Sequence, residues 1–263
     1  MLILIKGAGD LASGIALRLH HARFDIVMTD LPVPTAVRRT VAFSEAIRFG
    51  STVVEDTTAE KADTIDQIRD CLKRGVIPVT TGLENEIIGI LKPEVIVDAI
   101  IAKKNINTHI EDAPLVIAVG PGFTAGVDCH AVVETKRGHT LGRIIREGSA
   151  IPNTGIPGNI AGETIRRLIK APKDGIFHPV KEIGELVIRG VIVGYVDGEP
   201  VFTETAGMIR GLLQDGVPVT EGFKCGDVDP RGPLADYTTV SDKALAIGGG
   251  VLEAIMAYAA DRI

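Results

Sequence analysis

The N-terminal stretch Leu2-Ile3-Leu4-Ile5-Lys6-Gly7-Ala8-Gly9-Asp10-Leu11-Ala12 contains the pattern that decides the predicted fold. A short apolar run is followed at once by a glycine-rich turn, and residues 13–19 then alternate larger apolar residues with small ones. This order predicts a strand, a tight turn and a helix. A second apolar run at residues 24–29 ends at Asp30, so the sequence predicts a β-α-β unit.

The alternation of strands and helices continues beyond this unit. Further strands are predicted at residues 52–54, 76–80 and 115–119, a helix at residues 59–74, and either a strand or a helix at residues 93–101. Repeated strand and helix patterns are typical of a largely parallel sheet with helices on both faces. The sequence therefore predicts an α/β fold whose first domain, residues 1–112, is a Rossmann-like parallel sheet.

The glycine turn is the candidate nucleotide site. In Gly7-x-Gly9-x-x-Ala12, the first glycine suits a tight turn, the second lets a pyrophosphate approach the backbone, and the alanine permits close helix packing. Asp30 lies 21 residues after Gly9, where a carboxylate can accept hydrogen bonds from a ribose diol. Asp10 adds a second carboxylate, which would repel a pyrophosphate unless it turned outward as a helix cap.

The hypothesis for this site is NAD(P) or another adenine nucleotide, bound by Gly7, Gly9, Asp10, Ala12 and Asp30. The alternative is a doubly wound sheet that keeps its glycine turn for packing only.

A second candidate loop follows the predicted strand at residues 115–119. Gly120 and Gly122 would lie at a carboxyl end of the sheet, where ligands bind in open α/β folds. Asn153 and Thr154 offer polar groups to a small anionic ligand. An ordinary domain exit and a surface loop have the same composition, so both interpretations stay open.

Other candidate groups are isolated in the sequence. Arg38 and Arg39 would favour a 2′-phosphate on the nucleotide, although Asp30 argues against one, and both arginines also suit a solvated surface. Cys129 and Cys225 could carry sulfur or selenium, or they could simply be small apolar residues of the core. Cys225 is expected to be the more accessible of the two. No ligand spacing indicates a metal site, and none is predicted.

The middle of the chain, residues 113–172, is predicted to be rich in loops. Residues 129–135 alternate as a strand, whereas residues 151–159 contain too much Gly, Pro and Asn for regular structure. One basic helix is predicted at residues 161–170.

An internal repeat occupies the last third. Residues 175–197 align without a gap onto residues 207–229, and seven positions are identical, four of them glycine. Each copy alternates apolar strands with glycine turns and is too short to bury its apolar face alone. We therefore expect the two copies to pack together as a β module over residues 173–232, followed by a C-terminal helix within residues 233–263 that docks on the first domain.

The duplicated unit resembles the barrel-sandwich fold of biotinyl and lipoyl carrier domains. In those carriers, an exposed lysine in the hairpin between the halves holds the cofactor. The corresponding connection here, residues 198–206, contains no lysine. The resemblance therefore implies the fold without the swinging-arm chemistry, since no amine can be acylated there.

Composition narrows the classes of function. The 263 residues carry 28 Lys and Arg against 34 Asp and Glu, a net charge of −6, so we expect no nucleic-acid partner. No apolar run reaches the roughly 18 to 20 residues of a membrane span, and the N-terminus lacks the pattern of a signal peptide. Three widely spaced cysteines indicate no disulfide framework. We expect a cytoplasmic protein with no membrane partner, and a homo-oligomer is compatible with the sequence.

Five segments together resemble the YqeB-type proteins, accessory proteins associated with selenium-dependent molybdenum hydroxylases: residues 7–14, 34–46, 120–128, 153–158 and 226–231. The resemblance covers nearly the whole chain. It implies a role in maturing or supplying the selenium or molybdenum cofactor of the hydroxylase, with that enzyme or its cofactor machinery as the partner. It transfers no catalytic residue, so the sequence does not decide whether the chain is an enzyme.

Two other functions stay open. One is an NAD(P)-dependent oxidoreductase acting on a small molecule, in which residues 153–159 would cover the substrate. It lacks an obvious proton donor near a predicted strand end. The other is a non-catalytic scaffold for a molybdenum enzyme, in which the β module binds the partner.

Overall fold

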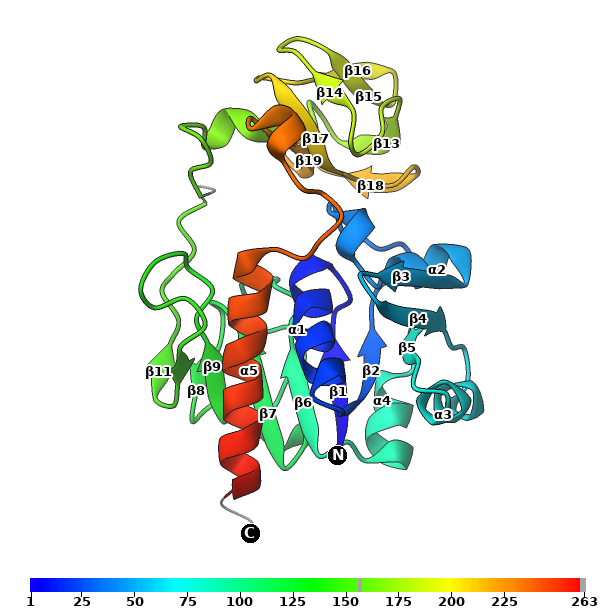
Figure 1. Cartoon of the computed structure of the whole chain (residues 1–263), viewed down its shortest axis with the longest axis vertical. Helices are drawn as coiled ribbons and strands as arrows, with labels where there is room; N and C mark the ends of the chain where they lie inside the picture. The colour runs from blue at the N-terminus through cyan, green and yellow to red at the C-terminus, as the bar shows by residue number, and fades with distance from the viewer. Residues whose placement is uncertain (156–157, 261–263) are drawn as a thin grey trace. The chain divides into compact units, whose positions relative to one another are not determined.

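The protein is described by a computed structural model that covers residues 1–155 and 158–260 (Figure 1). The chain forms two compact units: unit 1 is Met1–Pro32, Ala42–Asn153 and Val240–Ile263, and unit 2 is Val33–Val41 and Thr154–Thr239. Residues 156–157 of the predicted irregular loop and residues 261–263 of the predicted C-terminal helix segment lie outside the described residues. The predicted division of the chain into residues 1–112, 113–172, 173–232 and 233–263 stays a prediction.

Unit 1 is built on a nine-stranded sheet with the order β10-β9-β7-β6-β1-β2-β5-β4-β3. Its strands are β1 (Leu2–Lys6), β2 (Asp25–Thr29), β3 (Ser51–Val54), β4 (Thr57–Lys61), β5 (Ile77–Thr80), β6 (Val95–Asp98), β7 (Leu115–Val119), β9 (Ala131–Val133) and β10 (Ile144–Ile145). A separate two-stranded sheet pairs β8 (Thr124–Ala125) with β11 (Gly148–Ser149). The central strands are continuous apolar runs because both of their faces are buried.

The prediction of a Rossmann-like parallel-sheet domain is wrong, because the sheet is mixed. Its two edges are antiparallel hairpins, β3 with β4 and β9 with β10. The turn between β3 and β4 holds only Glu55 and Asp56, with Glu55 at a φ of 55°, and a connection this short can only join antiparallel strands. Within the described residues 99–114, β6 connects to β7 through the single turn η3 (Ile110–Asp112) and not through a covering helix.

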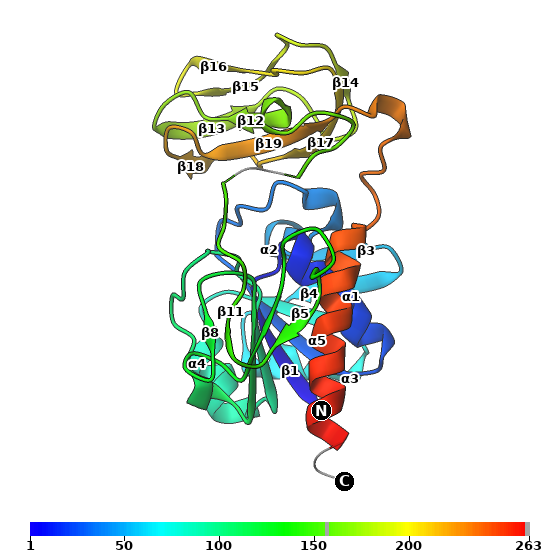
Figure 2. The ribbon, with the colours of Figure 1, turned by 90° about the vertical axis from the view of Figure 1, so that its left-hand side faces the viewer.

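Two helices lie side by side on unit 1 (Figures 1 and 2): α1 (Asp10–His21) and α5 (Asp242–Ala260). Their backbones approach closely because Gly14 of α1 faces Ala244, and Gly248 of α5 faces Arg18. Among the described residues, α5 is the one helix long and apolar enough to cross a membrane by length and composition. Its packing against α1 is that of a covering helix, and the predicted docking of the C-terminal helix on the first domain is confirmed.

The remaining short helices of unit 1 are α2 (Glu45–Phe49), α3 (Ile65–Lys73), α4 (Glu84–Glu86) and the π-helical turn η2 (Ile87–Leu91). The predicted helix at residues 59–74 is in fact the strand β4 followed by α3. Residues of β4 alternate between buried and more exposed, which is the period of a strand. Thr64 then caps α3, because its Oγ1 accepts a hydrogen bond from the Gln67 amide at 3.2 Å.

Unit 2 contains two four-stranded antiparallel sheets, β12-β19-β17-β14 and β16-β15-β13-β18, which form a half-barrel. The strands are β12 (Leu168–Lys170), β13 (Gly175–Pro179), β14 (Leu186–Val187), β15 (Ile192–Val196), β16 (Glu199–Phe202), β17 (Gly207–Leu212), β18 (Val217–Val219) and β19 (Lys224–Asp229). Three 3-10 turns complete it: η1 (Arg39–Val41), η4 (Ile165–Arg167) and η5 (Gly232–Leu234). The shared apolar core lies between the sheets.

The internal repeat is visible in the strand pairing of unit 2. Phe177 pairs with Val196 in the first copy, and Ile209 pairs with Val228 at the equivalent positions of the second copy. The predicted biotinyl or lipoyl barrel-sandwich is nevertheless wrong. β12 lies before the repeat and extends one sheet, and β14 spans only two residues, so the strands form a half-barrel.

The predicted basic helix at residues 161–170 is also wrong. Its end forms η4 and then β12, which pairs with β19. Sheet pairing and the burial of Arg167 override the local helix tendency of this segment.

Candidate functional site

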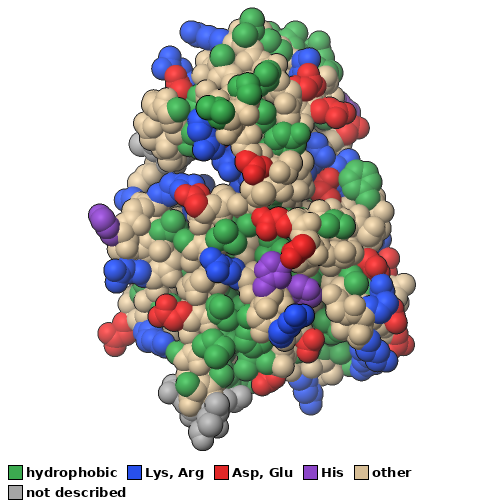
Figure 3. All heavy atoms as spheres, in the orientation of Figure 1, with side chains coloured by type: hydrophobic (Ala, Val, Ile, Leu, Met, Phe, Trp, Pro, Cys, Tyr) green, Lys and Arg blue, Asp and Glu red, His purple; other side chains and the backbone are tan. Residues whose placement is uncertain are grey.

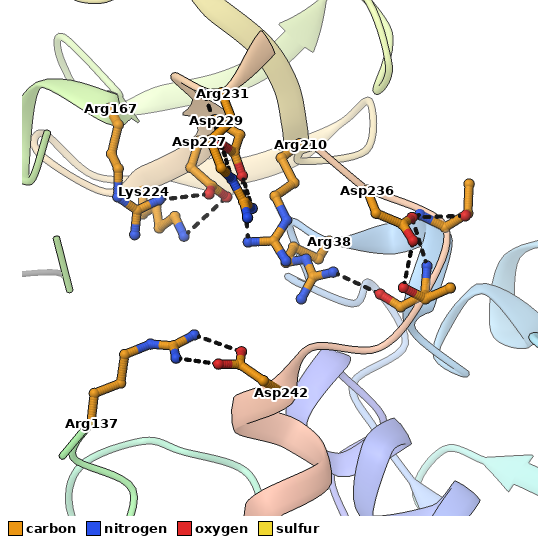
Figure 4. Close-up of polar contacts among 12 residues, drawn as sticks. Arg38, Arg137, Arg167, Arg210, Lys224, Asp227, Asp229, Arg231, Asp236 and Asp242 are labelled. Atoms are coloured by element: carbon orange, nitrogen blue, oxygen red, sulfur yellow. Dashed lines mark hydrogen bonds and ion pairs between the residues drawn. The ribbon is translucent and has the colours of Figure 1, made fainter. Parts of the chain in front are cut away.

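A group of charged side chains gathers in unit 2 around two buried aspartates, Asp227 and Asp229 of β19 (Figure 4). We call it the basic cluster and define it by five cationic residues and these two acids: Arg38, Arg167, Arg210, Lys224, Arg231, Asp227 and Asp229. Acidic and basic side chains are interspersed over the face shown in Figure 3, so the cluster is defined by its internal contacts.

A β-bulge positions Arg210. Strands β17 and β19 pair regularly up to Ile209 opposite Val228, but the next pair is Gly211 opposite Asp227. Arg210 is therefore the extra residue of the bulge. A bulge of this kind redirects the side chain of the extra residue.

Gly211 makes room for the Asp227 carboxylate. A Cβ atom at this position would lie 2.9 Å from Asp227 Oδ1 and 3.0 Å from the Val37 carbonyl oxygen. The segment that carries Arg38 runs along this part of β17, because the Leu212 amide donates to the Val37 carbonyl oxygen at 2.7 Å.

The two aspartates have different partners. Arg167 Nη1 donates to Asp227 Oδ2 at 2.9 Å, and Lys224 Nζ lies 3.4 Å from Asp227 Oδ1. Arg231 forms a two-pronged pair with Asp229, with Nε 2.9 Å from Oδ1 and Nη2 2.6 Å from Oδ2. Asp229 therefore has Arg231 as its nearest partner, whereas Asp227 is paired with Arg167 and Lys224.

Arg210 is the least satisfied member of the cluster. Its side chain is 13% exposed, and its nearest ion-pair contact is Asp229 Oδ2, 3.9 Å from Nη1. Among the residues that the structure describes, no hydrogen bond reaches its Nε, and the same holds for Nε of Arg167. Asp227 Oδ1 is likewise buried without a hydrogen bond within the described residues, so the cluster holds unsatisfied donors and one unsatisfied acceptor.

Burial and charge act against each other in the cluster. Burial raises the pKa of Asp227, but Lys224, Arg167, Arg210 and Arg38 outweigh it, so the net pKa is lowered and the carboxylate stays charged. Burial, followed by the charge of Arg38, lowers the pKa of Arg210. Arginine nevertheless keeps its proton at neutral pH. The cluster therefore retains five positive charges against two negative ones.

The end of unit 2 holds Arg38 in place. Arg38 Nη2 donates to the Thr239 carbonyl oxygen at 3.2 Å. Asp236 orders this stretch, because its carboxylate accepts hydrogen bonds from the amide and the hydroxyl of both Thr238 and Thr239 (Figure 4). Arg39 Nε donates to the Leu212 carbonyl oxygen at 2.8 Å. The interpretation of Arg38 as solvated surface is wrong, because Arg38 is buried.

The glycine turn and Asp30 are adjacent in unit 1. Gly7 has a φ of 96°, and the Ala8 amide donates to Asp30 Oδ2 at 2.8 Å, while the Leu31 amide donates to Oδ1 at 2.7 Å. Helix α1 begins at Asp10, with Gly9 as its N-cap. Burial raises the pKa of Asp30, and the two amide hydrogen bonds oppose that rise.

These contacts describe how the turn is built. A Cβ atom at Gly7 would lie 2.8 Å from the Ala99 carbonyl oxygen, so Gly7 is required for packing, and Ala12 is buried. Whether a nucleotide binds there stays a prediction.

The residues of the candidate second loop lie in different parts of the chain's fold. Gly120 and Gly122 both have positive φ, and a Cβ at Gly122 would collide with the backbone of Lys104. Asn153 is the last residue of its segment in unit 1, and Thr154 begins the next segment of unit 2. Both are exposed, and whether a ligand binds at this second loop stays a prediction.

The sequence analysis missed a buried lysine in unit 1. Lys6 is fully buried at the end of β1. Its Nζ donates to Thr108 Oγ1 at 2.9 Å and to the Asn107 carbonyl oxygen at 3.0 Å, and it lies 2.9 Å from Glu84 Oε1. Thr108 in turn donates to Asp98 at 2.7 Å. This network fixes the segment after β6 against the end of the sheet.

The cysteines are buried. Burial is the main cause that raises the pKa of the Cys129 thiol to about 11 and that of Cys225 to about 12. The expectation that Cys225 would be the more accessible is wrong. A thiol with a raised pKa contains little of the nucleophilic thiolate at neutral pH.

Comparisons with known proteins identify a relative but no function. No protein-family model matches the chain. The curated protein named "Uncharacterized protein YqeB" of Escherichia coli (strain K12) is 51% identical over 255 residues, which are 97% of this chain and 47% of that protein. The chain is similar to YqeB. It spans about half the length of this YqeB relative, and the YqeB resemblance expected from the sequence is supported.

The similar solved structures are distant. An aspartoacylase family protein from Mesorhizobium loti is 12% identical, with a TM-score of 0.29 over 89% of this chain and 86% of that chain. A succinylglutamate desuccinylase/aspartoacylase from Rhodobacter sphaeroides is 18% identical, with a TM-score of 0.27 over 86% of this chain and 84% of that chain. TM-scores this low carry no argument about activity.

Proposed function

We propose that this chain is a cytoplasmic accessory protein for a selenium-dependent molybdenum hydroxylase and that it binds an anionic ligand at the basic cluster of unit 2. The observation that carries the ligand site is the pair of nearly buried arginines, Arg167 and Arg210, whose Nε atoms have no hydrogen-bond acceptor within the described residues. The accessory role and its partner rest on the YqeB resemblance. An anion would accept hydrogen bonds from these donors.

The competing explanation is that the cluster only stabilises the fold. The charge of Arg210 helps to compensate Asp227 and Asp229, but burying its Nε donor without an acceptor is unfavourable for folding. The first copy of the repeat supports this reasoning. It carries His178 and Tyr195 at the positions of Arg210 and Asp227, and its equivalent strands β13 and β15 pair in a regular register. The β unit therefore folds without the charges of the cluster.

A calorimetric titration tests the ligand site. The full chain at low ionic strength is titrated with sodium sulfate as the probe, and we expect saturable binding that weakens as sodium chloride is added. The Arg210→His variant is expected to bind more weakly. The absence of any sulfate binding at millimolar concentration would contradict the ligand site.

A genetic experiment tests the role. In a host that makes a selenium-dependent molybdenum hydroxylase, deletion of this chain is expected to lower the activity of that hydroxylase without lowering the amount of its mRNA. The wild-type chain should restore the activity and the Arg210→His variant should restore less. Full hydroxylase activity in the deletion strain would overturn the accessory role.

A further inference from the structure

We infer that β3, an edge strand of the nine-stranded sheet of unit 1, pairs antiparallel with β3 of a second copy of this chain. The two sheets then join into one across a twofold axis at Thr52. This inference concerns unit 1 and goes beyond the proposed anion site of unit 2. It is carried by three features of β3: its unprotected edge, its outward backbone groups and the charges at its two ends.

Among the described strands, β3 is the least protected edge strand. Proteins usually protect a sheet edge with a proline, a charge, a bulge or a very short strand, because its unpaired backbone groups can bind another chain. β8, β10, β11 and β14 each contain only two residues, and β12 has an irregular register with its neighbour. β16 contains Pro200 and β18 contains Pro218. β3 has the four residues Ser-Thr-Val-Val, none of these devices, and a regular register with β4.

The outward backbone groups of β3 belong to Ser51 and Val53. The Lys61 amide donates to the Gly50 carbonyl oxygen at 2.8 Å, so these two residues form a hydrogen-bonded pair of the hairpin that β3 forms with β4. Hydrogen-bonded pairs alternate along an antiparallel ladder, so Thr52 is the next residue of β3 that bonds to β4. The amides and carbonyls of Ser51 and Val53 therefore point away from β4. Within the described part of the chain, no hydrogen bond reaches them.

These outward groups match those of a second β3 in one register. With Thr52 opposite the partner's Thr52, Ser51 lies opposite the partner's Val53, and Val53 opposite the partner's Ser51. Each of these pairs exchanges two hydrogen bonds, so all four outward groups of each strand find an acceptor or a donor. A shift by two residues would instead require residues 49 or 55, which lie in α2 and in the turn. The Val53 side chain is 59% exposed, and the second strand would cover part of it.

The two ends of β3 differ in charge, which favours the antiparallel direction. Glu55 and Asp56 follow β3, and the Asp56 side chain is 72% exposed. Arg48 precedes β3, and its Nη1 lies 2.8 Å from Glu45 Oε2. Parallel pairing would bring the acidic turns of both copies side by side, and like charges on adjacent strands are unfavourable. Antiparallel pairing separates the two turns and places each at the end of the joined sheet where the partner's Arg48 lies.

Sedimentation equilibrium of the full chain tests the dimer. We expect the wild-type chain to approach twice the monomer mass as its concentration is raised to about 100 μM. Val53→Pro removes an outward amide without removing a bond to β4, so it should raise the dissociation constant at least roughly 10-fold. Val53→Lys places a charge on the edge and should act in the same direction. Val180→Lys is the matched control, because Val180 is an exposed residue of unit 2 and its change should leave the dissociation constant unaltered.

Cysteine variants test the register. Directly opposed residues at a non-hydrogen-bonded position have Cα atoms about 4.5 Å apart, which is within the range of a disulfide. Thr52→Cys should therefore cross-link two copies under mild oxidation. Ser51→Cys faces the partner's Val53, so it should cross-link at least roughly 10-fold more slowly. The wild-type chain is the control, since its three cysteines are buried. Non-reducing gel electrophoresis measures the cross-linked fraction.

Each outcome either supports or overturns the inference. A wild-type chain that stays monomeric at every concentration would overturn the dimer. A dimer that persists unchanged in folded Val53→Pro and Val53→Lys variants would overturn β3 as the interface. Equal rates of cross-linking in the Thr52 and Ser51 variants would overturn the register. Near-ultraviolet circular dichroism establishes that each variant is folded. Sulfate titration tests the anion site of unit 2 separately, so failure of the dimer is distinguishable from failure of the proposed function.

Discussion

Arg167 and Asp227 form an ion pair at 2.9 Å in unit 2, and their side chains are only 10% and 5% exposed. They lie 60 residues apart in the sequence, and the pairing of β12 with β19 brings them together. Breaking such a pair on one side leaves a charge buried without its counterion, and this loss exceeds the net stabilisation from the pair itself.

The first prediction concerns this pair. Arg167→Met should lower the free energy of unfolding by about 3 to 5 kcal/mol, because Asp227 then stays buried with less compensation. In the double variant Arg167→Met/Asp227→Asn, part of that loss should be recovered. Urea unfolding of the single and double variants measures the coupling. Strictly additive losses would contradict the interpretation of a buried, mutually dependent pair.

The second prediction concerns the buried lysine of unit 1. Lys6→Met removes the cation that holds Glu84 and the backbone at Asn107, and should lower the unfolding free energy by about 3 to 5 kcal/mol. Lys61→Met is the matched control. Its ion pair with Asp63 is exposed, so the change should be less than about 1 kcal/mol. Similar losses of unfolding free energy in the two variants would show that the Lys6 network stabilises the fold no more than an exposed ion pair does.

The third prediction concerns the approach of α1 to α5. A Cβ atom at Gly14 would lie 2.5 Å from the Ala244 Cβ, so Gly14→Ala should force the helices apart and lower the unfolding free energy by about 1 to 3 kcal/mol. A Cβ atom added at Gly249 of α5 would have no neighbouring atom within 4 Å among the described residues. Gly249→Ala should therefore stabilise the protein by about 0.5 to 1 kcal/mol through helix propensity. Thermal unfolding monitored by circular dichroism would detect both, and effects of the same sign would refute the argument.

The fourth prediction concerns pH. Hydrogen bonds from the hydroxyl of Thr239 and from the amide and hydroxyl of Thr238 lower the pKa of Asp236. A lowered folded-state pKa contributes stability that is fully present above the unfolded-state pKa of about 3.9 and is lost as the pH falls through the folded-state value. The wild-type chain should therefore be more stable than Asp236→Asn near neutral pH, and the difference should shrink under acid conditions. Urea unfolding of both proteins at a series of pH values measures it, and a constant difference would argue against this assignment.

The fifth prediction concerns the glycine turn of unit 1, for which nucleotide binding stays a prediction. If the hypothesis holds, at least one of NAD, NADP, FAD and the adenine nucleotides should bind in a calorimetric titration. Asp30→Ala should weaken that binding, because the carboxylate lies beside the Ala8 amide of the turn. The Arg189→His variant is the control, since its exposed side chain is far in sequence from the turn. If none of these nucleotides binds, Gly7 and its neighbours have a packing role only.

The positions of several elements could be predicted because their signals are local. The apolar run at residues 2–6 and the glycine turn after it lie where the sequence predicts them, and the terminal helix α5 docks on α1 as expected. Strand direction could not be predicted, since an apolar run has the same composition in a parallel and an antiparallel pair. The helix predicted at residues 59–74 was wrong because tertiary pairing converted its first part into β4.

The basic cluster was missed although a signal for it exists in the sequence. Alignment of the two repeat copies emphasises what they share, whereas the cluster lies where they differ: Arg210 replaces His178, and Asp227 replaces Tyr195. A comparison of charge between the copies would have identified these positions. It would not have found Arg38 or Arg167, which lie outside the repeat.

The duplicated β unit, the glycine turn and the apolar runs could be read from the amino-acid sequence, because backbone preferences and hydrophobic periodicity act over a few neighbouring residues. Long-range contacts in the folded chain make the large sheet mixed, place a bulge in β17 at Arg210, and bring the side chains of residues 38, 167 and 210 around the same aspartates. Burial and charge compensation depend on groups brought together from distant parts of the chain, and no local pattern encodes that proximity.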